Sequence, residues 1–172
     1  GPAFKDVDNR LMSLQLVRNG MTNAVMFAPS GNNVLPANVL YKKNILTLRG
    51  SFRPVTNVNI SMYEKSLQMF MDEHKVERAA TEVIFEMTLF NLKAEGDEID
   101  EKDFLNRADL LCALGHTVMI SNFQQYYKVV DYFAQFTSEP IGLTMGVTTL
   151  IDIFDDKYYN ENAVHLFYSG IP

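Results

Sequence analysis

Residues 44–71 read NILTLRGSFRPVTNVNISMYEKSLQMFM, an apolar run followed by a loop and a longer periodic segment. Ile45, Leu46 and Leu48 form the pattern of a short buried strand. Over residues 58–71 the apolar side chains recur at helical spacing and fall mostly on one face. The stretch therefore predicts a buried strand, a loop and an amphipathic helix.

The same alternation of apolar runs and helical patterns continues along the chain. It predicts a helix within residues 4–20, strands at 24–28, 82–89, 117–121 and 141–146, and helices at 102–114, 124–136 and near 150–158. The expected N-caps of the last three helices are Asp100, Asn122 and either Thr148 or Thr149.

Strands that alternate with helices in this way are typical of right-handed βαβ units, and we count four such units. Four strands are too few to close a barrel of eight. We therefore predict an α/β fold with an open, mainly parallel, Rossmann-like sheet and helices on both faces. Residues 1–20 are expected to form an N-terminal helix behind a tag remnant, residues 21–160 an α/β nucleotide-binding-like domain, and residues 161–172 an irregular tail.

The composition excludes several classes of partner. The net charge of −6 over 172 residues argues against binding to nucleic acid or to an anionic membrane, because phosphates attract a surplus of Lys and Arg. No apolar run approaches the roughly 18 residues that span a bilayer, and the single cysteine, Cys112, forms no intrachain disulfide. These features predict a cytoplasmic protein with no membrane partner. The nine methionines either line a homo-oligomer interface or fill gaps in the core.

The loop after the strand at residue 44 is the strongest candidate for a binding site, because parallel sheets bind ligands at the carboxyl ends of their strands. Gly50 lets a phosphate approach the backbone, while Ser51 and Thr56 offer hydroxyl groups. The following helix begins with free amides and a positive dipole end. Arg49 and Arg53 are expected to add fork-like contacts to phosphate. Three further loops follow strands at the same edge, at residues 88–101, 121–124 and 146–149.

Residues 50–59, GSFRPVTNVN, resemble the first motif of the nicotinamide and nicotinate mononucleotide adenylyltransferases. That motif runs Gly, Ser or Gly, Phe, Asn or Asp, Pro, Ile or Val, Thr or His, two variable residues and His. Here Arg53 replaces the Asn or Asp, and Asn59 stands at the position of the closing His. More broadly, residues 20–160 resemble longer bacterial proteins that carry the label of this family.

The resemblance implies an activity and assigns roles. Thr56 and Asn59 would be the catalytic residues, and Arg49, Gly50, Ser51, Phe52 and Arg53 would bind the nucleotide. The implied reaction is the transfer of AMP from ATP to a pyridine mononucleotide, a step of NAD biosynthesis, by in-line attack on the α-phosphate. ATP and Mg²⁺ would be the cofactors, with a carboxylate within residues 95–101 holding the ion.

An alternative remains open beside this interpretation, so the assignment as a nucleotidyltransferase enzyme is left undecided. Asn59 in place of His, and the lack of a second phosphate motif, favour a non-catalytic ligand-binding or assembly domain that kept the loop and lost the chemistry. The loop would also serve as an ordinary turn before a helix. No two of the three histidines show metal-ligand spacing, so no metal-binding residue is assigned. His116 is expected to cap or face solvent at the amino end of a strand, and Cys112 to be a buried thiol.

Overall fold

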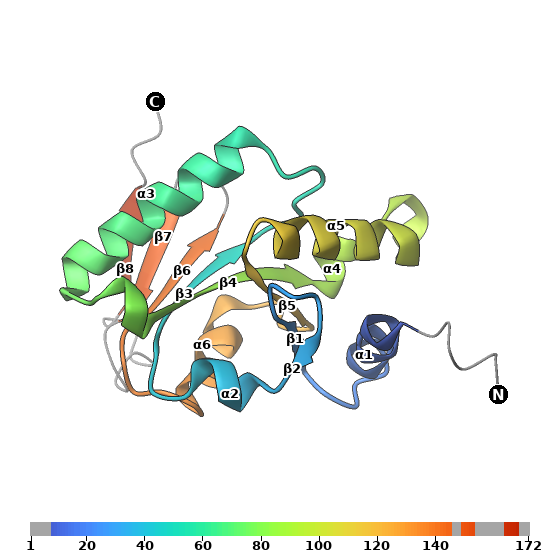
Figure 1. Ribbon diagram of the computed structural model, residues 1–172, viewed down its shortest axis with the longest axis horizontal. Helices are drawn as coiled ribbons and strands as arrows, with labels where there is room; N and C mark the ends of the chain where they lie inside the picture. The colour runs from blue at the N-terminus through green and yellow to red at the C-terminus, as the bar shows by residue number, and fades with distance from the viewer. Residues whose placement is uncertain (1–7, 146–148, 154–163, 169–172) are drawn as a thin grey trace.

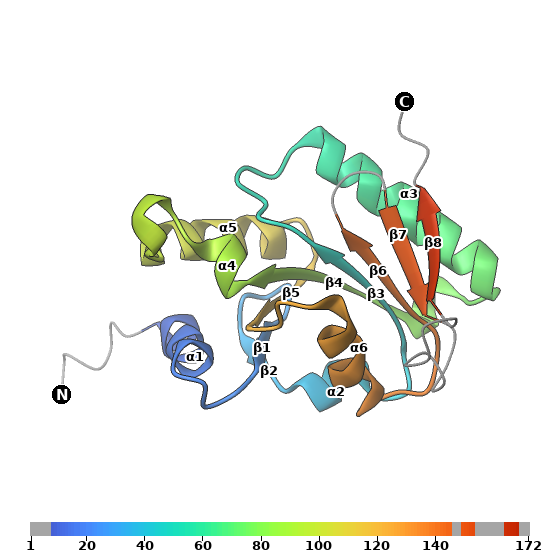
Figure 2. The same ribbon diagram turned by 180° about the vertical axis from the view of Figure 1, so that it is seen from behind.

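Eight strands form one sheet in the order β2-β1-β5-β4-β3-β6-β7-β8, with helices on both faces (Figure 1, Figure 2). The computed structural model describes residues 8–145, 149–153 and 164–168. The strands are β1 Ala24–Phe27, β2 Asn33–Val34, β3 Asn44–Arg49, β4 Thr81–Thr88, β5 Thr117–Ser121, β6 Ile141–Met145, β7 Thr149–Ile153 and β8 Val164–Tyr168. The helices are α1 Asn9–Arg18, α2 Pro36–Leu40, α3 Asn57–His74, α4 Leu89–Leu92, α5 Glu101–Ala113 and α6 Tyr126–Ala134, with short 3-10 helices at Arg78–Ala80 and Glu95–Asp97.

The four central strands, in the order β5-β4-β3-β6, are parallel. Antiparallel strands extend the sheet on both sides, β1 and β2 beyond β5, and β7 and β8 beyond β6. The chain leaves β3 toward β4 and later returns to pair β6 on the other side of β3. This reversal is a topological switch point, and it lies between β3 and β6. The predicted Rossmann-like α/β architecture is confirmed.

Each face of the central strands is covered by its own helices. On the first face, Leu46 and Leu48 of β3 share an apolar core with Phe70 of α3 and Phe104 of α5. On the second face, Ile45 packs in a separate core with residues of α2 and α6. Since both faces of the parallel strands are buried, their sequences are nearly continuous apolar runs. In Figure 1, α3 and α5 lie above the sheet, and α2 and α6 lie below it.

A glycine allows α3 to lie close on the sheet. A Cβ atom added to Gly142 of β6 would come within 2.7 Å of the Phe70 ring. No side chain fits between the strand and the helix at this point. The contact fixes α3 over β3 and β6, and so fixes where the helix begins.

The end of the chain differs from its prediction. The helix expected near residues 150–158 is wrong, because Thr149–Ile153 forms β7, antiparallel to β6. Residues 164–168, where the sequence shows no period, form β8 against β7. The β-branched Thr149, Ile151 and Ile153 favour a strand, and pairing covers the backbone groups of β6 that would otherwise form an edge. The parallel core therefore has three helical crossovers rather than four; residues 154–158 lie outside the described residues.

The other predicted elements agree with the structure to within a few residues, whereas β2, α2 and α4 were not predicted. Asp100 caps α5 as expected. Asn122 does not cap α6, which begins at Tyr126 with Gln125 as its N-cap residue. Cys112 is buried. Within the described ranges, none of the helices has the length and apolar character that crossing a bilayer requires.

Candidate functional site

The loop between β3 and α3 lies at the carboxyl edge of the parallel strands, beside the switch point, as predicted (Figure 1). The Gly50 amide donates to the Glu86 carbonyl at 3.1 Å, which keeps the loop attached to β4. The Phe52 ring folds back into the core, with 4% of the residue exposed and 5.2 Å between the centroids of its ring and that of Phe85. A Cβ atom on Gly50 would lie 3.3 Å from that ring. Phe52 thus offers a ligand only its backbone, while Ser51 is exposed.

Thr56 and Asn59, the predicted catalytic pair, lie together and cap α3. The Asn59 amide donates to Thr56 Oγ1 at 3.3 Å, and Asn59 Oδ1 accepts from the Thr56 amide at 2.8 Å and from its hydroxyl at 3.0 Å. The amides of Asn57 and Val58, the first two of the helix, have no acceptor among the described residues. An 18-residue helix therefore presents bare N–H groups at this edge, the arrangement that suits an anion.

The same capping arrangement occurs at the end of β4. Asn91 Oδ1 accepts from the Thr88 amide at 3.0 Å and from its hydroxyl at 2.9 Å, and the Asn91 amide donates to Thr88 Oγ1 at 3.1 Å. There it begins the four-residue helix α4. The Thr-x-x-Asn pattern thus caps the helix that follows each of two neighbouring strands, so capping alone accounts for its presence at Thr56.

Arg49 makes a buried ion pair on the second face of the sheet. Its Nε and Nη2 donate to the two carboxylate oxygens of Glu86 at 2.8 and 3.1 Å, and Nη1 donates to the Gln124 carbonyl at 3.1 Å. The Ser121 hydroxyl donates to Glu86 Oε2 at 2.6 Å. Side-chain exposure is 10% for Arg49 and 0% for Glu86. Sequence analysis placed Ser121 in a candidate loop at this edge but missed Glu86, although a carboxylate inside the apolar strand at residues 82–89 was a visible signal.

Arg53 holds the loop onto the elements that follow β4. It donates to the Asp103 carboxylate at 2.5 Å, and to the carbonyls of Leu92 and Lys93 at 3.3 and 3.4 Å. The predicted phosphate contact of Arg53 therefore competes with an existing partner.

Arg107 of α5 also holds this loop, through the carbonyl groups that it contacts. It is 4% exposed and donates to the carbonyls of Ser51, Asn91 and Leu92 at 2.8, 3.1 and 3.3 Å. Its Nη2 lies 2.8 Å from Asp103. Burial lowers the pKa of Arg107, opposed by the charge of Asp103. The Ser51 carbonyl therefore points inward, which turns the amide of the same peptide group outward.

Several carboxylates of the acidic segment after α4 are already engaged with other protein groups. Asp97 lies 3.0 Å from Lys93, Asp100 accepts from the Asp103 amide at the start of α5, and Asp103 binds two arginines. In the part of the chain that the structure describes, no three His, Cys, Asp or Glu side chains are grouped to hold an ion. The Mg²⁺ expected at a carboxylate within residues 95–101 therefore stays a prediction.

His116 and Glu82 lie at the opposite, amino edge of the strands. They line a cavity of about 420 Å³ together with Asn38, Arg78 and Thr117. The His116 ring stacks on Phe85, 4.1 Å between centroids, and burial and then Arg78 lower its pKa. Burial raises the pKa of Glu82, opposed by Lys43 and Arg78. His116 is thus held among aromatic rings rather than facing solvent.

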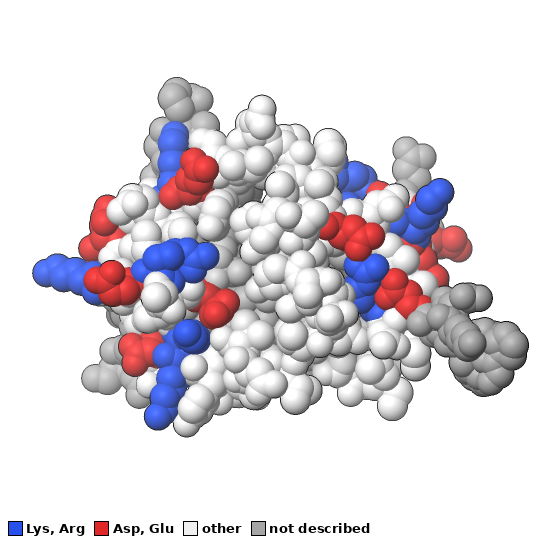
Figure 3. Space-filling view, viewed as in Figure 1, with Lys and Arg blue, Asp and Glu red and all other residues white. Residues whose placement is uncertain are grey.

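Charge is distributed unevenly over the face that carries α3. Figure 3 shows Lys, Arg, Asp and Glu at the two sides and an uncharged band between them. The first turns of α3 have no charged side chain before Glu64. Backbone amides are therefore the anion-attracting groups at the beginning of this helix.

Comparison with models of known families, with curated proteins and with solved structures finds no match for this chain.

Proposed function

We propose that this chain is a nucleotide-binding domain related to the mononucleotide adenylyltransferases, and that it holds the phosphates of a small-molecule nucleotide at the beginning of α3. The observation that carries the proposal is the position of that helix, whose first amides are bare at the carboxyl edge beside the switch point. Ligands of open α/β sheets bind at this place, and helix N-termini bind phosphates.

The capping pair supports the binding role. Thr56 and Asn59 hold each other, so the first turn of α3 is fixed and the amides of Asn57 and Val58 stay directed outward. Arg107 turns the Ser51 carbonyl inward, and Gly50 leaves the backbone accessible beside it. A phosphate would then be bound by main-chain amides within residues 51–58 that have no acceptor in the described part of the chain, those of Asn57 and Val58 among them.

Transfer of AMP from ATP to a pyridine mononucleotide is the second candidate, supported by the motif at residues 50–59 in its expected position. Binding without transfer is favoured by two side chains that are already engaged. Arg53 is paired with Asp103, and the Asn59 carboxamide is held by Thr56 and is uncharged. Stabilising a transferring phosphoryl group requires charge, which Asn59 lacks.

A thermal-shift titration with ATP, nicotinamide mononucleotide, nicotinate mononucleotide and NAD tests the proposal. A ligand at 100 times its dissociation constant stabilises the folded state by about 2.7 kcal/mol. In a domain of this size that corresponds to a rise in melting temperature of roughly 5–10 °C. No shift with any of the four would overturn the nucleotide proposal.

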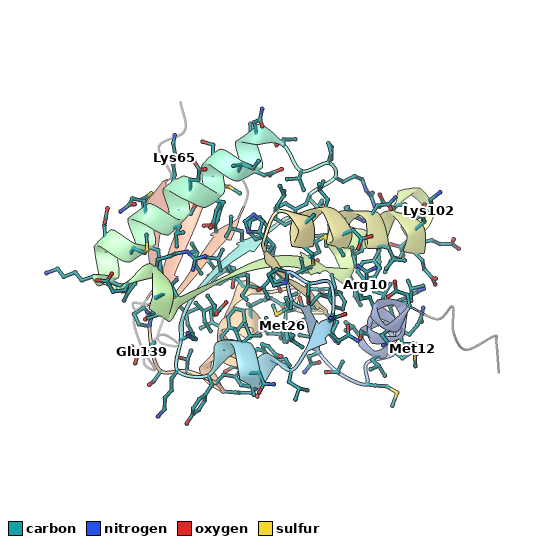
Figure 4. The ribbon with its side chains drawn as sticks, in the orientation of Figure 1. Arg10, Met12, Met26, Lys65, Lys102 and Glu139 are labelled. Carbon is teal, nitrogen blue, oxygen red and sulfur yellow. The ribbon has the colours of Figure 1, made fainter. Side chains whose placement is uncertain are left out.

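Two charge variants separate the phosphate site from general electrostatics. Val58→Glu places a carboxylate in the first turn of α3, where it suits the helix dipole but repels a phosphate. Met12→Glu makes the same change on α1, on the other side of the molecule (Figure 4). Val58 and Met12 are 49% and 56% exposed. We expect Val58→Glu to fold and lose the nucleotide shift, and Met12→Glu to keep it.

A turnover assay decides between binding and transfer. Release of pyrophosphate from ATP and a pyridine mononucleotide would establish the transferase. A nucleotide shift without pyrophosphate release would support the binding domain and not the transferase.

A cytoplasmic location and a homo-oligomer belong to the same proposal. The buried free thiol of Cys112 agrees with a reducing compartment. Light scattering would measure the oligomeric state.

A further inference from the structure

A buried polar cluster crosses three strands at the carboxyl edge, on the face opposite α3. It consists of Arg49 at the end of β3, Glu86 of β4 and Ser121 at the end of β5. Arg49 and Glu86 are direct neighbours in the parallel register. We refer to these three residues as the Arg49 cluster.

Stability does not account for the Arg49 cluster. Removing two charges from water costs several kcal/mol per ion, and apolar pairs of similar volume often replace buried ion pairs without loss. The surroundings would accept such a pair, because Met119 and Phe123 beside it belong to the apolar core of the second face. A polar cluster kept at this cost, at the edge where ligands bind, is a candidate for function.

The geometry leaves Arg49 with donors to spare. A guanidinium has five N–H groups, and Glu86 and the Gln124 carbonyl occupy three of them. The remaining two are on Nη1 and Nη2. Three hydrogen bonds fix the orientation of the guanidinium, and 10% of the side chain is exposed.

We infer that Arg49 binds an oxyanion of the ligand, a phosphate or a carboxylate, and that Glu86 and Ser121 are positioning residues for its guanidinium. A planar fork held in one orientation suits the two oxygens of such a group. The inference rests on the proposed function for the location of the ligand, but it concerns the second face of the sheet and different donors from the amides of α3.

The decisive variant replaces the charge pair as a unit. Arg49→Met combined with Glu86→Leu leaves no unpaired charge, so we expect the melting temperature to stay near that of the wild type. Isothermal titration calorimetry then measures the affinity for pyrophosphate, nicotinate and ATP. We expect the affinity for at least one of them to fall by about tenfold or more, because losing a charge-assisted hydrogen bond has an effect of this size. Pyrophosphate and nicotinate distinguish phosphate from carboxylate as the group recognised.

Two single variants keep the test valid if the double variant fails to fold. Arg49→Lys keeps the charge but loses the fork, and Ser121→Ala removes one of the two donors to Glu86 Oε2, so that only Arg49 holds this oxygen. We expect weaker binding in both, and the Arg49 Nε–H NMR signal of the wild type to move when the anion is added. A purely structural cluster would leave both the affinity and that signal unchanged.

The outcomes separate this inference from the proposed function. Equal affinity of the wild type and the folded variants overturns the role of Arg49 and leaves nucleotide binding intact. Pyrophosphate or nicotinate binding that depends on Arg49, without nucleotide binding, supports the Arg49 cluster and overturns the nucleotide proposal. A wild type that binds no anion overturns both.

Discussion

Glu82 and Glu86 lie four residues apart on β4 and on the same face of the sheet, but their carboxylates have different partners. Glu86, at the carboxyl edge, is 0% exposed and accepts two hydrogen bonds from Arg49 and one from Ser121. Glu82, at the amino edge, lines a cavity, and burial raises its pKa although Lys43 and Arg78 favour its charge.

The difference shows what a direct partner does for a buried carboxylate. A carboxylate in an apolar region loses its hydration, and only hydrogen bonds and a close opposite charge restore its stability. At the carboxyl edge that compensation is complete, because every oxygen of Glu86 has a donor. At the amino edge it is partial. The carboxyl edge should therefore depend on its partners, and the amino edge should respond to pH.

The largest expected effect is that of breaking the pair at the carboxyl edge. Glu86→Leu leaves the Arg49 guanidinium without its counter-ion in a site that is 10% exposed. We expect the free energy of unfolding to fall by about 3–5 kcal/mol, measured by urea denaturation. In the double variant with Arg49→Met most of this loss should disappear. A loss below about 1 kcal/mol in the single variant would show that water already solvates Arg49.

The two helix caps at the same edge should have intermediate effects. Removing an N-cap hydroxyl costs about 0.5–2 kcal/mol. We expect Thr88→Ala to lie at the upper end, because Thr88 is 5% exposed and its loss leaves the Asn91 amide without its acceptor at a buried place, and Thr56→Ala at the lower end, because Thr56 is exposed. Urea denaturation of both, with Thr88→Ser as the control that keeps the hydroxyl, gives the order; equal losses would contradict it.

The sequence predicts local relations well and distant ones poorly. Thr56 and Asn59 are three residues apart at a helix start, so their proximity follows from the helix itself. Arg49 and Glu86 are 37 positions apart and meet only because β3 and β4 pair in one particular register. Both residues are visible in the sequence, but the register that joins them is not.

The same distinction explains the fold. The central strands could be predicted, because burial on both faces gives nearly continuous apolar runs such as the one at residues 83–85. Residues 149–153, Thr-Leu-Ile-Asp-Ile, fit either a helix or a strand, and the unpaired side of β6 decides for the strand. Within the segment only the β-branched residues favour a strand, and pairing with β6 settles the choice.

At the amino edge, His116 should make stability depend on pH. Burial lowers its pKa below the ordinary value of 6.5, so the folded state resists protonation. The unfolded chain then binds more protons just below pH 6.5, and stability is lost as the pH falls from 6.5 through the folded pKa. His116→Phe should remove this loss, as measured by urea denaturation between pH 5 and 8. An unchanged difference between the two proteins over that range would contradict the role of burial.

The smallest effect is expected from Glu82→Gln, the counterpart of the change at Glu86. Removing the charge removes the desolvation cost that raises the pKa of Glu82, but it also removes the attraction between this carboxylate and Lys43 and Arg78. We expect a change in unfolding free energy within about 0.5 kcal/mol at pH 7, the range of a surface substitution. The difference in unfolding free energy between the two proteins should change with pH. Because the pKa of Glu82 is raised in the folded state, the wild type loses stability relative to the variant as the pH rises from 4.5 through that pKa. A loss as large as that of Glu86→Leu would mean that Glu82 has a close partner after all, and the two edges of β4 would then be alike.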